Sequence, residues 1–210
     1  FGIEAKKYSQ APGGCNLVAE YTGTGGGKTL AMGGHYDVVA ADETTWETEG
    51  GFVPTVKDGN LIGRGAADMK GGLACCFMAL KALKECDIKL KGNVQFVATV
   101  DEEIGSPYGM SYLAENKIIA PDFFINAEQT EMKIGVAYKG CAWMEVKVKG
   151  VTAHGSKPHL GVNAVVNAAK LIYMLDKKGV EFTPDPLLGN GSLNVGTIEG
   201  GTGINIVPDE

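Results

Sequence analysis

The chain has 210 residues, of which 44% are hydrophobic and 21% charged, and its formal net charge is −6. This length is enough for one large domain or for two smaller domains with cores of their own. The acidic balance and the lack of any basic run argue against nucleic acid and anionic membranes as partners. No apolar stretch is long enough to span a bilayer. From the charge and this absence together, we expect neither nucleic acid nor a membrane as a partner.

The first part of the chain alternates β-rich runs with amphipathic segments. Strands are predicted at residues 16–21, 29–33, 94–100 and 123–126. The first two flank a glycine turn, which predicts a hairpin or neighbouring strands. Apolar residues at i, i+3, i+4 and i+7 predict a helix over residues 68–86, and a second helix is expected at 107–116. Strands that alternate with helices predict an α/β fold with a mixed, largely parallel sheet.

The pattern changes near residue 136. Residues 141–149 alternate apolar and polar side chains, which predicts a strand with one face in water. An amphipathic helix is predicted at 162–175 and a further strand at 192–198. We therefore predict two domains, an α/β domain over residues 1–136 and a smaller α+β domain over residues 137–210.

The five cysteines are odd in number and include no CxxC pair. This pattern favours reduced thiols over a disulfide framework, and the spacing argues against a zinc–thiolate site. Reduced thiols predict a cytoplasmic protein.

Ionisable residues gather at the ends of the predicted strands. His35 and Asp37 follow the strand at 29–33, residues 101–103 follow the strand at 94–100, and Glu128 follows the strand at 123–126. Asp68 precedes the long helix. In an open α/β sheet, the carboxyl ends of the strands are where ligands bind.

Crowded carboxylates repel one another, and a divalent cation removes that repulsion. One histidine with several carboxylates suits zinc, cobalt or manganese better than calcium. A shared aspartate can bridge two ions, and a further glutamate can act as general base on the attacking water, as in hydrolases. A lone His35 would more often be a hydrogen-bonded structural residue, but the carboxylates around it favour a metal ligand.

Five segments carry a resemblance to a known family. They are GGHYDVV at 33–39, GRGAADMKGG at 63–72, DEEIGS at 101–106, NAEQT at 126–130 and GVTAHGSKPHLGVNAV at 150–165. Together they resemble the M20 metallopeptidase family of acetylornithine deacetylase, succinyl-diaminopimelate desuccinylase and carboxypeptidase G. The resemblance implies a zinc-peptidase-like catalytic domain followed by a lid or dimerisation domain, and a homodimer formed through that lid.

The resemblance also implies a metal-ligand set for two Zn²⁺ ions, with Co²⁺ or Mn²⁺ as alternatives. His35 and Glu128 would bind the first ion, Asp68 would bridge the two, and Glu103 would bind the second. The family has a last metal-binding histidine near its C-terminus. None of the three histidines of this chain fits that role, so we expect this ligand beyond residue 210.

The remaining roles implied by the resemblance are catalytic. Glu102 would be the general base and later the acid, and Asp37 would hydrogen-bond the ring of His35 and select its tautomer. His154 would donate to the oxyanion, in the active site of the partner subunit. Asn205 resembles a substrate-contacting asparagine.

Three functional hypotheses follow. The first is a deacylase that cleaves the amide bond of a small N-acyl amino acid. The second is a carboxypeptidase or dipeptidase of the same family, which would act on a small peptide. The third, from another class, is a metal-binding, non-catalytic fragment with a dimerisation module; the presence of Glu102 argues against it.

Overall fold

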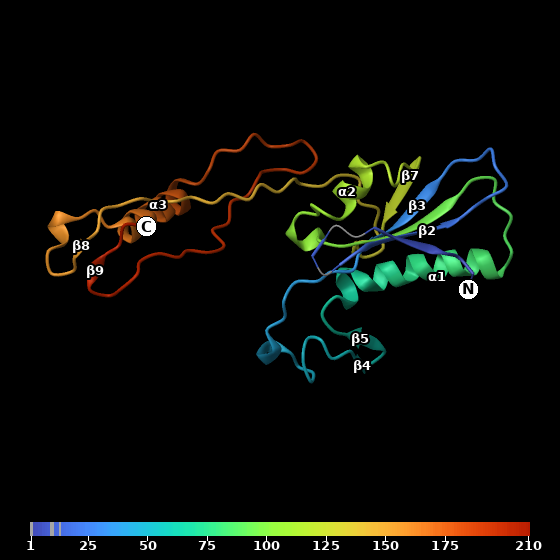
Figure 1. Ribbon diagram of the computed structural model, residues 1–210, viewed down its shortest axis with the longest axis horizontal. Helices are drawn as coiled ribbons and strands as arrows, with labels where there is room; N and C mark the ends of the chain where they lie inside the picture. The colour runs from blue at the N-terminus through green and yellow to red at the C-terminus, as the bar shows by residue number, and fades with distance from the viewer. Residues whose placement is uncertain (1, 9–10, 13) are drawn as a thin grey trace. The chain divides into compact units, whose positions relative to one another are not determined.

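The computed structural model describes residues 2–8, 11–12 and 14–210 (Figure 1). The chain divides into two compact units, Phe1–Lys133 and Ile134–Glu210. The division lies near the boundary that we expected after residue 136. The assignment of the two units as a catalytic domain and a lid stays a prediction.

The first unit is built on a five-stranded sheet in the order β1-β2-β6-β3-β7. Its strands are β1 (Ala5–Tyr8), β2 (Asn16–Tyr21), β3 (Leu30–His35), β6 (Val94–Thr99) and β7 (Phe123–Asn126). β3 runs parallel to both β6 and β7, whereas β2 runs antiparallel to β1 and β6. The predicted mixed α/β fold is therefore confirmed.

Helices cover both faces of this sheet, because neighbouring residues of a strand point to opposite sides. On one face, helix α1 (Gly71–Glu85) buries Cys76 and Leu80 against Met32 of β3. On the other face, Leu113 of helix α2 (Met110–Glu115) packs with Val97 of β6. The two helices lie on either side of the strands in Figure 1. Each face thus has its own apolar core.

The expected neighbour relation between the first two predicted strands is wrong, because β6 lies between β2 and β3. The glycine turn that joins them is tied to the segment before β6. The Gly23 amide donates to the Asn93 side chain (3.0 Å), and the Thr24 amide donates to the Leu90 carbonyl (2.8 Å). The turn therefore passes the amino-terminal end of β6 and does not join two neighbouring strands.

The long helix begins later than the predicted residue 68. The segment Ala66–Lys70 forms an irregular wide turn in which Asp68 (φ −114°, ψ 97°) and Met69 (φ −128°, ψ 29°) leave helical geometry. Met69 is fully buried, and its sulfur accepts a hydrogen bond from the His35 amide (3.2 Å). Burial of Met69 beside β3 overrides the helical periodicity and leaves the Asp68 carboxylate at the end of the sheet.

A small hairpin precedes this turn. Strands β4 (Thr55–Lys57) and β5 (Asn60–Ile62) pair across the turn at Asp58 and Gly59. Further short 3₁₀ turns lie at Glu43–Thr45 and Glu102–Ile104.

The second unit contains helix α3 (Ala164–Lys178), a 3₁₀ turn at Pro158–Leu160, and a short ladder between β8 (Ala153–His154) and β9 (Ile206–Val207). The Asn163 side chain caps α3 by accepting from the Val166 amide (2.9 Å). The strands predicted at 141–149 and 192–198 are not formed. Both segments lack a hydrogen-bonded neighbour, and side chains such as Trp143 are 70% exposed, so alternation alone does not make a strand.

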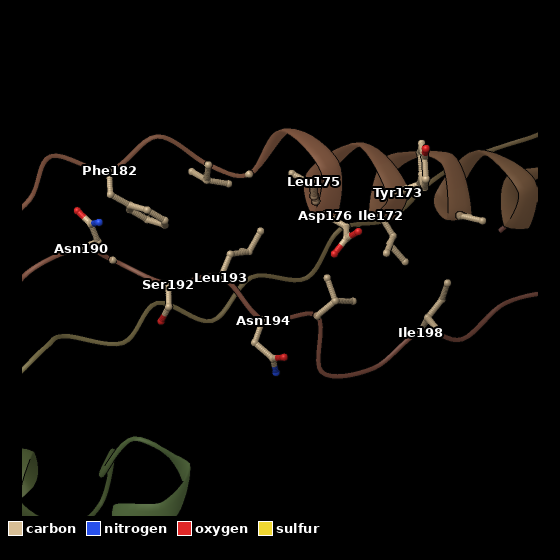
Figure 2. A pocket seen from close by; sticks show the side chains of 15 residues that line it. Ile172, Tyr173, Leu175, Asp176, Phe182, Asn190, Ser192, Leu193, Asn194 and Ile198 are labelled. Carbon is tan, nitrogen blue, oxygen red and sulfur yellow. The ribbon is translucent and has the colours of Figure 1, made fainter.

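The second unit also has a cavity of about 940 Å³ between α3 and the chain around residues 190–198 (Figure 2). Apolar side chains such as Ile172, Phe182 and Leu193 line it together with Asp176. Across the described ranges, no helix combines the length and the apolarity needed to cross a membrane. All five cysteines are described, and all are free thiols.

Candidate metal centre

The register of the parallel strands brings several predicted site residues to one edge of the sheet. His35 is the last residue of β3 and lies opposite Thr99, the last residue of β6. Gly33 of β3 lies opposite Asn126, the last residue of β7. The residues that follow β6 and β7 therefore emerge beside His35, at the carboxyl ends of the strands.

The ring of His35 is buried, with 1% of the side chain exposed. Its Nδ1 lies 2.9 Å from the main-chain oxygen of Asp37. A carbonyl oxygen only accepts hydrogen bonds, so Nδ1 carries a proton and donates it. In the neutral ring, Nε2 is consequently the atom that offers a lone pair.

Three carboxylates face this Nε2 atom. Oδ1 of Asp68 lies 3.2 Å from it, Oε1 of Glu128 lies 3.4 Å from it, and Oε2 of Glu102 lies 3.7 Å from it. A lone pair beside several negative oxygens is repulsive. Either a proton or a metal cation on Nε2 relieves that repulsion.

The electrostatics of the metal-free chain reflect this crowding. Burial lowers the pKa of His35, but the hydrogen bond to the Asp37 carbonyl and the charges of the nearby carboxylates outweigh it, and the pKa is raised above its ordinary value of 6.5. Burial raises the pKa of Glu128 above 4.5, and the neighbouring carboxylates add to that rise against the opposing effect of His35. Both shifts favour a proton at the place that a cation would take.

The donor set fits a divalent metal. Among the described residues, ligand atoms of His35, Asp68 and Glu128 all lie within 4.8 Å of one another. One imidazole with two carboxylates is a set that zinc and similar divalent ions accept. The hydrogen bond from Nδ1 to a carbonyl is also the usual support for a metal-binding histidine, since it orients the ring.

Glu102 and Glu103 lie in the short turn that follows β6. Glu102 borders the ligand group through its Oε2 atom, and about half of its side chain is exposed. The Glu103 carboxylate is not part of the group that meets around His35. The structure thus separates Glu102, which is near the ligands and open to solvent, from the three residues that can hold an ion.

The position of Asp37 differs in one respect from our expectation. We expected its carboxylate to hydrogen-bond the ring of His35. The ring bond goes instead to the main-chain oxygen of Asp37, and the nearest carboxylate oxygen lies 3.5 Å from Nδ1. The carboxylate accepts hydrogen bonds from the amides of Glu102 (3.3 Å) and Glu103 (3.2 Å).

A small cavity of about 230 Å³ opens beside the ligands. His35, Glu102 and Glu128 line it, together with Ser106 and Phe124, which sequence reasoning did not single out. Ser106 stands in the DEEIGS segment, so its motif was a usable signal. Phe124 had no such signal, because its position depends on the pairing of β7 with β3.

In the second unit, the structure brings His154 and Asn205 together. His154 pairs with Ile206 in the β8–β9 ladder, and the Gly155 amide donates to the Asn205 carbonyl (2.7 Å). Nδ1 of His154 accepts from the Ser156 amide (3.2 Å). An amide can only donate, so the neutral ring carries its proton on Nε2, where it can serve as a hydrogen-bond donor.

Comparison with known proteins identifies the family that the motifs suggested. The model of peptidase family M20/M25/M40 matches residues 31–193. Acetylornithine deacetylase of Proteus mirabilis is 35% identical over 212 residues, which cover 98% of this chain and 53% of the relative. A probable succinyl-diaminopimelate desuccinylase of Staphylococcus epidermidis is 39% identical over 167 residues, covering 79% of this chain and 40% of the relative. The chain spans about half the length of the curated relatives it matches.

Solved structures of peptidases are similar as well. A tripeptidase from Staphylococcus aureus is 27% identical with a TM-score of 0.58, covering 99% of this chain and 54% of that one. An M20 family metallo-carboxypeptidase from Sulfolobus solfataricus is 28% identical with a TM-score of 0.61, covering 83% of this chain and 41% of that one. The resemblance drawn from the five sequence segments is thereby confirmed.

Proposed function

The chain belongs to peptidase family M20/M25/M40, and from this membership we propose that its protein is a metal-dependent hydrolase that cleaves the amide bond of a small N-acylated amino acid. One observation carries the proposal. The buried Nε2 atom of His35 faces Asp68 and Glu128 at the end of the sheet, and Glu102 stands at the edge of that group.

We propose that His35, Asp68 and Glu128 hold a zinc ion, with Co²⁺ or Mn²⁺ as alternatives. A cation held there would supply Lewis-acid activation of a water molecule and of the amide carbonyl. A second ion would share Asp68 and take Glu103, as the family resemblance implies. The metal content of the purified protein tests the count.

The protein's own side chains would move the protons. We propose that Glu102 takes a proton from the attacking water as its oxygen bonds to the amide carbon. The same carboxyl group then gives the proton to the leaving nitrogen as the C–N bond breaks, so the products are an acid and an amine. A half-exposed carboxylate 3.7 Å from the ligand histidine can reach a water beside the ligands without joining them.

His154 would stabilise the oxyanion that forms during the attack. Its Nε2–H is available because the Ser156 amide occupies Nδ1. We propose that it serves the site of a second subunit in a homodimer formed through the second unit, and that Asn205 beside it contacts substrate. A monomeric mass in solution at working concentration would contradict the dimer. A cytoplasmic location is the accompanying proposal, which cell fractionation tests.

The substitution Glu102→Gln tests the catalytic proposal. Loss of a general base lowers the rate by about 10²–10⁴-fold, whereas zinc content should stay unchanged, because Glu102 is not a ligand. Glu115→Gln removes the same charge from an exposed position on α2 and should change neither quantity. Activity that survives Glu102→Gln would show that another group is the base.

A peptidase activity is the second candidate, supported by the similar tripeptidase and metallo-carboxypeptidase structures. Hydrolysis rates on N-acetyl, N-succinyl and N-formyl amino acids, compared with those on dipeptides and tripeptides, distinguish the two. The deacylase proposal predicts faster turnover of the acylated amino acids. Zinc binding with no turnover of either class would favour a metal-binding, non-catalytic protein with a dimerisation module.

A further inference from the structure

The carboxylate of Asp37 links two parts of the site that are far apart in the sequence. Its Oδ1 accepts from the Glu102 amide (3.3 Å), and its Oδ2 accepts from the Glu103 amide (3.2 Å). The two amides follow β6, whereas Asp37 follows β3. Both carboxylate oxygens are thus directed at the main chain of the residues that carry Glu102 and Glu103.

The ring of His35 makes its hydrogen bond to the main chain of Asp37 and not to this carboxylate. Its Nδ1 donates to the main-chain oxygen of Asp37 at 2.9 Å, while the nearest carboxylate oxygen lies 3.5 Å away. Any residue at position 37 has that main-chain oxygen. The tautomer of His35 should therefore survive the loss of the Asp37 side chain.

The turn that receives the two hydrogen bonds is an irregular one. Asp101 (φ 61°), Gly105 (φ 92°) and Ser106 (φ 61°) all have left-handed backbone conformations, which cost energy for residues other than glycine. Inside the turn, the amides of Gly105 and Ser106 bond back to the carbonyls of Glu102 and Asp101. The first amides of such a turn have no partner within it, and Asp37 supplies one for both.

We propose that Asp37 is a positioning residue whose carboxylate anchors the Glu102–Ile104 turn and so holds the Glu102 side chain at the edge of the ligand group. The hydrogen bond that orients the His35 ring comes from the main chain. The catalytic consequence rests on the proposed function, whereas the anchoring itself is a property of the folded, metal-free chain.

The experiment compares hydrogen exchange and histidine tautomers in the wild type and in Asp37→Asn, both metal-free. An asparagine keeps one accepting oxygen and replaces the other with a donor, so at least one of the two amides loses its partner. We expect exchange at Glu102 or Glu103 to become about tenfold faster, as for the loss of one hydrogen bond to a charged group. The ¹⁵N shifts of the His35 ring should stay unchanged.

Asp122→Asn is the matched control. Oδ2 of Asp122 accepts from the Thr29 amide (2.8 Å) at the opposite end of β3. Among the described residues, Asp122 accepts only this one amide hydrogen bond, so its asparagine can keep it, and the variant should leave the amides of Glu102 and Glu103 as they are. Unchanged exchange at both of those amides in Asp37→Asn would overturn the proposal, and a changed tautomer of His35 would show that the ring depends on the carboxylate.

If Asp37→Asn fails to fold, a measurement on the wild type tests the two hydrogen bonds of Asp37 directly. Scalar couplings across the hydrogen bonds should join the side-chain carboxyl carbon of Asp37 to the amide nitrogens of Glu102 and Glu103, and their absence would overturn the proposal. Neither readout requires activity. An anchored turn in a protein that hydrolyses no amide would refute the proposed function alone, and an unanchored turn in an active protein would refute the positioning role alone.

Discussion

Asn16 offers the most direct test of how the site is supported, because it is fully buried and holds the end of β6. Its Nδ2 donates to the Tyr108 carbonyl (2.7 Å), and its Oδ1 accepts from the Val100 amide (3.1 Å). Asn16→Ala removes both partners. A buried, unpaired Val100 amide costs about 1–3 kcal/mol, and the second hydrogen bond is worth about 1 kcal/mol, since solvent can reach Tyr108. We therefore expect a loss of about 2–4 kcal/mol in the free energy of unfolding.

Urea unfolding, followed by the fluorescence of Trp46 in a Trp143→Phe background, measures this loss in the first unit alone. Asn60→Ala is the control, because Asn60 is exposed and donates only to the Asp58 carbonyl (3.3 Å). The control should stay within about 0.5 kcal/mol of the parent. A similarly small change in Asn16→Ala would refute the reasoning that this side chain supports the turn after β6.

Two further predictions concern the ligands directly. A Cβ atom on Gly72 would lie 1.9 Å from the Ala127 carbonyl oxygen, so Gly72→Ala should displace the segment that carries Glu128. We expect this variant to lose about 1–3 kcal/mol of stability and to bind zinc more weakly in titrations. Gly140→Ala is the control, because its Cβ atom meets nothing within 4 Å, and it should change neither stability nor zinc binding. The raised pKa values of His35 and Glu128 mean that the metal-free folded chain binds more protons than the unfolded chain above pH 6.5 and 4.5 respectively. The stability contributed by these protons is full below those values and is lost as pH rises through the raised pKa values, while zinc affinity rises over the same range. Thermal unfolding with and without zinc, at pH values on either side of the raised His35 pKa, should show a zinc-induced increase in Tm that grows with pH; an increase that shrinks with pH would contradict the assignment.

Local patterns in the sequence predicted the elements whose stability comes from their own periodicity and burial. The strands predicted at 16–21 and 123–126 agree with β2 and β7, and α1 occupies most of the helix predicted at 68–86. The alternation of elements correctly indicated an α/β fold, in which the sheet is only partly parallel. The order of the sheet was not predictable from pairing rules, because β6 forms ladders with both β2 and β3, and these pairings are not local in the sequence.

The positions of the site residues were predictable to the level of the sheet edge but not to the level of single atoms. That His35, Asp68 and Glu128 meet follows from strand ends and motifs that the sequence displays. The carboxylate of Asp37 bonds to a turn that begins after the left-handed residue Asp101, and no local pattern signalled that conformation. In the second unit, alternation predicted strands that lack a neighbour to pair with, and pairing is a property that a single segment cannot reveal.

We propose above that His35, Asp68 and Glu128 form a metal site at the edge of the sheet. Elemental analysis of the purified wild type and of His35→Ala, after dialysis against zinc and removal of free metal, tests it most directly. We expect at least one zinc ion per wild-type chain and a large loss of zinc in the variant. A wild-type chain without tightly bound metal, or a variant that keeps the full complement, would contradict it.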